Sequence, residues 1–124
     1  MDVNASLSNL RGRFTMNQGT TTMDGTEQTL YENTSSPVCF SSCVHCKDVA
    51  GEDSITLKQY VKVVTGGDYV ELVDKRVTVT AATTQLAVNI LAAHPLRCVA
   101  WKITAEQTAG TNRDLDWNFV TSIQ

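Results

Sequence analysis

The sequence of 124 residues has no apolar run near the roughly 20 residues that a membrane-spanning helix needs. It also lacks an excess of basic residues. Its net charge of −3 argues against a nucleic-acid-binding protein, because few lysines and arginines are available to displace counterions from phosphates. The N-terminus is polar and lacks the basic-then-apolar layout of a signal peptide, so we expect no export signal. The length suits a single globular domain with one two-layer core.

Residues that favour helices are scarce, whereas threonine and valine, which favour strands, are abundant. The stretch Ser54–Thr80 predicts two long strands joined by a tight turn at Gly66-Gly67. In the return strand the alternation slips near Asp74, which indicates a β-bulge. Apolar side chains of the first strand fall on one face, at Ile55, Leu57, Val61 and Val63.

The same alternation predicts further strands in the ranges 27–32, 38–46, 86–90, 99–104 and 114–119. About seven strands with no helix long enough for a crossover indicate an all-β protein: a single antiparallel β-sandwich, jelly-roll or immunoglobulin-like. A small barrel is the alternative. Trp101 and Trp117 lie on apolar strand faces, so we expect both in the core.

Residues 1–26 differ from the β-sandwich domain predicted for residues 27–124, because they are polar with thinly spread apolar side chains. Val3, Leu7, Leu10 and Phe14 nevertheless have the spacing of a short amphipathic helix. Two interpretations stay open. The segment is either a frayed tail or an N-terminal arm that becomes ordered when its apolar stripe binds a partner.

The segment CFSSCVHC concentrates the groups that could carry chemistry, namely Cys39, Cys43 and Cys46 together with His45. Its C-x3-C-x2-C spacing matches that of radical-SAM iron–sulfur enzymes, but the chain is too short and too poor in helices for their barrel. Zinc is a second possibility. On a regular strand Cys39, Cys43 and His45 would share one face and Cys46 the other, so a complete site would need a further ligand, Cys98 or His94.

Two other roles for the cysteines remain open. Cys46 and Cys98 could form a disulfide if their strands are adjacent. The plainer interpretation is that cysteine serves as a small buried apolar side chain, with no cofactor present. Four free thiols would suit assembly in a reducing cytoplasm.

No arrangement of catalytic residues is evident in the sequence. Glu52 and Asp53 fall in a turn, where carboxylates commonly accept backbone hydrogen bonds. Asp114 and Asp116 alternate on the predicted solvent face of the last strand. We therefore predict that the protein is not an enzyme.

Three segments together resemble a family of small β-sandwich virion proteins of tailed phages and related viruses: EQTLYE, AGEDSITLKQYVKV and WKITAEQTAGTNRDLDWNFVTS. The resemblance spans about residues 27 to 122 and departs from the family at Cys43 and Cys46, where an aliphatic or aromatic residue is expected. It implies a cement or decoration protein that binds the major capsid protein at the outer surface of the virion. Such proteins often form homotrimers and are made in the host cytoplasm.

In this interpretation the N-terminal arm would extend the contact across a subunit boundary. The residues expected to make that contact are Leu7, Leu10, Arg11, Arg13 and Phe14. Two alternatives remain: a tail, neck or fibre-associated virion protein, and a small cysteine-rich metal-binding or redox β-protein. The second would use Cys39, Cys43, Cys46 and Cys98.

Overall fold

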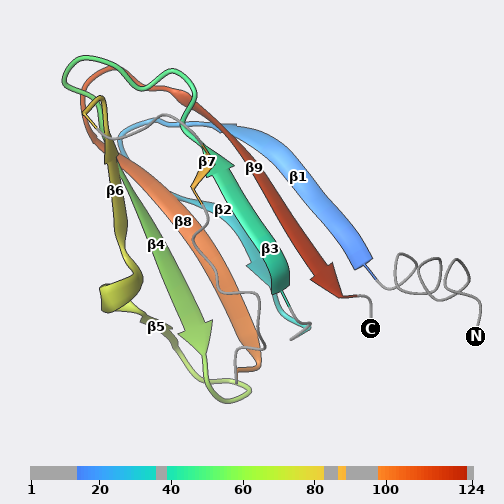
Figure 1. Ribbon diagram of the computed structural model, residues 1–124. Helices are drawn as coiled ribbons and strands as arrows, with labels where there is room; N and C mark the ends of the chain where they lie inside the picture. The colour runs from blue at the N-terminus through green and yellow to red at the C-terminus, as the bar shows by residue number, and fades with distance from the viewer. Residues whose placement is uncertain (1–13, 36–38, 83–86, 89–97, 123–124) are drawn as a thin grey trace, which may run out of the picture.

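The computed structural model describes residues 14–35, 39–82, 87–88 and 98–122 and contains two β-sheets that face each other (Figure 1). The described residues include no helix long and apolar enough to span a membrane. A short 3-10 turn, Val73–Lys75, lies between the fifth and sixth strands. The strands are β1 (Phe14–Thr22), β2 (Glu27–Asn33), β3 (Cys39–His45), β4 (Ser54–Lys62), β5 (Tyr69–Glu71), β6 (Val77–Thr80), β7 (Ala87–Val88), β8 (Ala100–Ala109) and β9 (Asp114–Ser122).

Sheet A has the strand order β1-β9-β3-β7 and sheet B the order β2-β8-β4-β5, with β6 also paired to β4. The strand pairs are antiparallel. The predicted all-β antiparallel sandwich is therefore confirmed. Successive strands mostly alternate between the two sheets, as in a jelly roll, whereas the first two strands of an immunoglobulin sandwich share one sheet.

The core lies between the sheets and is filled by the inward-facing residues of the alternating strands. Ile55 and Leu57 of β4 and Ile103 of β8 are buried there, as the alternation predicts. Trp101 is buried and Trp117 packs half-buried against the core, so both tryptophans lie where the sequence places them. Tyr31, Trp101, Trp117 and Phe119 form a cluster of rings with centroids 5.5–6.2 Å apart.

The predicted boundary at residue 26 placed residues 14–22 in a separate N-terminal arm. In the structure these residues belong to the sandwich instead. They form β1, which pairs with β9 along its whole length, from Phe14 opposite Ser122 to Thr22 opposite Asp114. The helical spacing that ends at Phe14 is local, whereas pairing with β9 supplies hydrogen bonds over nine residues. Leu7, Leu10, Arg11 and Arg13 lie outside the described residues.

The central hairpin is present, but its return strand is broken. The 3-10 turn separates β5 from β6 at the position where the sequence predicted a bulge near Asp74. Gly66 has a φ of 79°, which glycine adopts at little cost, and the Gly67 amide donates to the Val64 carbonyl at 3.0 Å. The sequence predicted Val63 on the inner face of this strand. β4 ends at Lys62, however, and Val63 is 61% exposed.

A buried carboxylate ties two turns together at one end of the sandwich. Asp53 is 3% exposed and accepts hydrogen bonds from the amides of Ala50 (3.0 Å) and Thr111 (2.8 Å) and from Arg113 Nε (2.6 Å). The Ala50 amide and the Arg113 guanidinium hold the pKa of Asp53 below its usual value. The expectation that a carboxylate of this turn accepts backbone hydrogen bonds is confirmed for Asp53.

Candidate functional site on the outer face of sheet A

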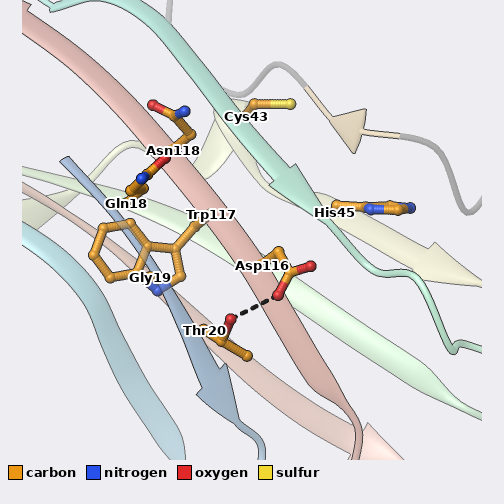
Figure 2. A pocket seen from close by; sticks show the side chains of 8 residues that line it. All are labelled: Gln18, Gly19, Thr20, Cys43, His45, Asp116, Trp117 and Asn118. Atoms are coloured by element: carbon orange, nitrogen blue, oxygen red, sulfur yellow. Dashed lines mark hydrogen bonds between the residues drawn. The ribbon is translucent and has the colours of Figure 1, made fainter. Parts of the chain in front are cut away.

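The outer face of sheet A is hollowed where β1, β9 and β3 lie side by side (Figure 2). The hollow has a volume of about 580 Å³. Its lining is mainly polar and comes from segments far apart in the sequence. The lining residues are Gln18, Gly19, Thr20, Cys43, His45, Asp116, Trp117 and Asn118.

Two rows of side chains cross the three strands. In one row Gln18 pairs with Asn118, which pairs with Cys43; in the next, Thr20 pairs with Asp116, which pairs with His45. Residues two apart on a strand share a face, so the alternation that buries Leu115 and Phe119 also turns Asp116 and Asn118 outward. The outward position of Asp116 confirms the sequence prediction.

Gly19 and Trp117, paired across β1 and β9, complete the lining. A Cβ at Gly19 would lie only 2.7 Å from Cζ2 of the Trp117 indole, so glycine is the residue that lets this ring pass beneath β1. The indole Nε1 then donates to Thr21 Oγ1 at 3.0 Å. Tyr31 and Phe119 flank the ring, with centroids 6.0 and 5.8 Å away. Trp117 thereby fastens β1 to the rest of sheet A.

Asp116 is the charged centre of the hollow. Thr20 Oγ1 donates to its carboxylate at 2.7 Å, drawn as a dashed line in Figure 2, and Lys47 Nζ lies 3.0 Å away. The hydroxyl and the ammonium lower the pKa of Asp116, and the carboxylate raises the pKa of Lys47. Asp116 is therefore held ionised and already partnered, which suits a fixed polar surface better than proton transfer.

The cysteines do not lie where a regular strand would place them. Cys43 is half-buried on the outer face with His45, but Cys39 is buried in the core, not on the face of Cys43 as predicted. The register shifts between Cys39 and Ser41, and this irregularity turns Cys39 inward. Cys46 faces inward as predicted.

Cys46 and Cys98, the proposed pair, are not joined by a disulfide in the structure. Burial raises the pKa of Cys46 to about 11 and also raises the pKa values of Cys39 and Cys98. No group of three or more His, Cys, Asp or Glu residues in the described part of the chain is arranged to hold a metal ion. His94, the other candidate ligand, lies outside those residues.

Sheet B presents a different outer face, whose charged groups bond to one another. Glu27 accepts hydrogen bonds from the hydroxyls of Tyr60 (2.5 Å) and Thr104 (2.8 Å) and from Lys58 Nζ (3.3 Å). Lys102 lies over the ring of Tyr60, 5.0 Å from its centroid. Charged groups are therefore bonded to neighbouring side chains on this face, as Asp116 is to Thr20 and Lys47 on sheet A.

Sequence reasoning missed the β1 side of the hollow, Gln18, Gly19 and Thr20. The available signal was a glycine among threonines, which is compatible with a strand that packs against a large ring, but nothing local identified Trp117 as its partner. Arg76, which forms an ion pair with Glu71 at the edge of sheet B, was also missed.

No family model matches the sequence, and no curated protein matches it. Among solved structures, the fold is similar to that of a chain from the disulfide-linked pili that form Bacillus endospore appendages. The two share 12% sequence identity with a TM-score of 0.52, over 90% of each chain. Likeness at this identity shows a common sandwich fold; it is a likeness to a pilus chain and not to a capsid decoration protein.

Proposed function

We propose that this protein is a non-enzymatic structural subunit of an assembly displayed at a surface, built from repeated copies of the sandwich. The observation that carries the proposal is the fold shared with a disulfide-linked pilus chain over nine-tenths of both proteins. In this proposal the sandwich acts as a rigid block. Function then resides in its faces and edges, through which repeated weak contacts add up to a stable assembly.

The chemistry of the hollow supports this role. Asp116 is held by Thr20 and Lys47, and the remaining lining offers amide, thiol and imidazole groups. Such groups make hydrogen bonds to a neighbouring protein surface, which is how interfaces obtain their orientation. Cys43 is the half-buried thiol of this face and is placed for a cross-link between copies in an oxidising environment.

The test is electron microscopy of the purified full chain, combined with electrophoresis with and without reductant. We expect regular particles or filaments, and a covalent dimer that returns to the monomer on reduction and is lost in Cys43→Ser. Cys46→Ala is the matched control, because its thiol is buried and should not contribute to the cross-link. A protein that stays monomeric at all concentrations and binds no particle would refute the proposal.

A second candidate is the capsid cement protein implied by the resemblance of EQTLYE, AGEDSITLKQYVKV and WKITAEQTAGTNRDLDWNFVTS to virion proteins. Its partner would be a major capsid protein, with homotrimers on the virion surface and contacts from Leu7, Leu10, Arg11, Arg13 and Phe14. Cosedimentation with capsids, with and without residues 1–13, tests this candidate. Binding to tail or fibre components would favour the tail alternative. Stoichiometric zinc in native mass spectrometry would favour a metal-binding protein.

A further inference from the structure

The exposed edges of the two sheets differ in how well they are protected against pairing with another strand. Edge strands are usually blunted by charges, bulges, interruptions or short length. β2 carries Glu27 and Glu32, and its register shifts between Thr29 and Tyr31. The edge formed by β5 and β6 is broken by the 3-10 turn and carries charged side chains. β7 spans only two residues.

β1 has none of these protections. It is nine residues long, FTMNQGTTT, without a charged residue or a proline. Its register with β9 runs from Phe14 to Thr22 without a shift, and no described strand pairs with its other side. Met16 is 61% exposed on this strand. A long, neutral and regular edge of this kind is a template for pairing with another strand.

We propose that β1 pairs antiparallel with β1 of a second copy of this chain, which joins two four-stranded sheets A into one continuous sheet. This inference rests on the proposed function and names the surface through which copies meet. The symmetric register places Gln18 opposite Gln18 of the second copy, with Thr20 opposite Met16 and Thr15 opposite Thr21. Such an interface is isologous, so each β1 makes the same contacts as its partner.

The side chains of β1 fit this register. Positions that face each other across the pair lie on the same side of the sheet, because their separation from Gln18 is equal on both strands. Threonine–threonine pairs across strands are favourable, and Met16 gains cover from Thr20 of the second copy. The nearest acids on sheet A, Asp114 and Asp116, lie one strand away and accept hydrogen bonds from Thr22 and Thr20.

Net charge also favours β1 as the place where copies meet. Each copy carries a net charge of −3, so contacts between charged faces are opposed by repulsion. Of the edge strands, β1 combines useful length with a complete absence of charge. Copies that approach through β1 therefore meet the least electrostatic opposition and gain a row of backbone hydrogen bonds.

Charge complementation at the symmetry axis tests the proposal. Gln18→Lys and Gln18→Glu each place two like charges opposite one another, and each should raise the dissociation constant of the pair by about ten-fold or more. An equimolar mixture of the two variants should restore association to within about three-fold of wild type, because lysine then faces glutamate. Sedimentation velocity of the full chain in reductant measures the dissociation constant of the pair without interference from disulfides.

Thr29→Lys is the matched control, because Thr29 is exposed on the edge strand β2. It should leave association unchanged. Gln18 is exposed as well, so thermal unfolding should show that all three variants keep the fold.

Three outcomes would overturn the inference. If Gln18→Lys and Gln18→Glu associate as tightly as wild type, β1 is not the interface, while assembly and the proposed function stand. If both variants associate more weakly than wild type and the mixture does not restore association, the register is not symmetric about Gln18. If removal of residues 1–13 alone dissociates the pair, the interface between copies is formed by that segment instead of β1. A wild type that forms no assembly at all would count against the proposed function itself.

Discussion

Replacing Gly19 with alanine should destabilise the protein through a single identifiable clash. Gly19 pairs with Trp117, and an added Cβ would lie 2.7 Å from Cζ2, 3.1 Å from Cε2 and 3.3 Å from Cη2 of the indole. The φ of Gly19 lies outside the left-handed region, so alanine meets no backbone penalty there. Any loss of stability must therefore come from contact with the ring.

The indole cannot move away freely. Its Nε1 is bonded to Thr21 Oγ1, and the rings of Tyr31 and Phe119 flank it. Overpacking of this kind costs about 1–3 kcal/mol. The replacement of glycine also lowers the conformational entropy of the unfolded chain, and this offsets about 0.4–1 kcal/mol of the lost stability. We expect a net loss of about 1–2 kcal/mol, and a melting temperature lower by about 4–8 °C.

Urea unfolding followed by tryptophan fluorescence measures the loss, with Trp101 as a second reporter. A double-mutant cycle with Trp117→Leu isolates the contact. In that background the ring is gone, so Gly19→Ala should be neutral or stabilising by up to about 1 kcal/mol. Equal destabilisation in both backgrounds would refute the reasoning, because the cost could not then arise from the indole.

Two further predictions concern titration and thiol access. Desolvation and hydrogen bonds to Glu27 and Glu32 raise the pKa values of Tyr60 and Tyr69 from 10 to about 12. The protonated tyrosines therefore stabilise the folded protein, and this contribution is lost as the pH rises from 10 to about 12. Urea titrations at a series of pH values should show that the free energy of unfolding falls less steeply over this range in the double variant Tyr60→Phe/Tyr69→Phe than in wild type. In the native protein a thiol reagent should label Cys43 readily and spare Cys46, whose burial raises its pKa to about 11; equal labelling by mass spectrometry would contradict its place in the core.

Strands that carry their own apolar alternation could be predicted from the sequence. Leu115 and Phe119 alternate with Asp116 and Asn118, so β9 and the direction of its faces follow from the period of two. β1 gives no such signal, because its inward positions are held by Asn17, Gly19 and Thr21. Its place in the sheet depends on Trp117, whose hydrogen bond to Thr21 spans 96 positions of the chain.

The hollow could be predicted only in part for the same reason. The outward position of Asp116 follows from alternation, but its bond to Thr20 depends on β1 lying beside β9. The misplacement of Cys39 has a different origin. The strand register shifts between Cys39 and Ser41, and this irregularity turns Cys39 inward. A prediction based on strict alternation does not include such a shift.

The two outer faces of the sandwich lead to different expectations for contact between copies. On sheet B, Glu27 is bonded to Tyr60, Thr104 and Lys58, so a partner would have to break existing bonds to form new ones. Sheet A combines a polar hollow with an edge strand that carries no charge. Association through β1 adds hydrogen bonds at little cost in broken ones and leaves the charged face of sheet B in solvent. A block with one associating edge and one solvated face forms pairs first, and any larger assembly must use a second contact, for which the hollow and Cys43 lie on the same sheet as β1.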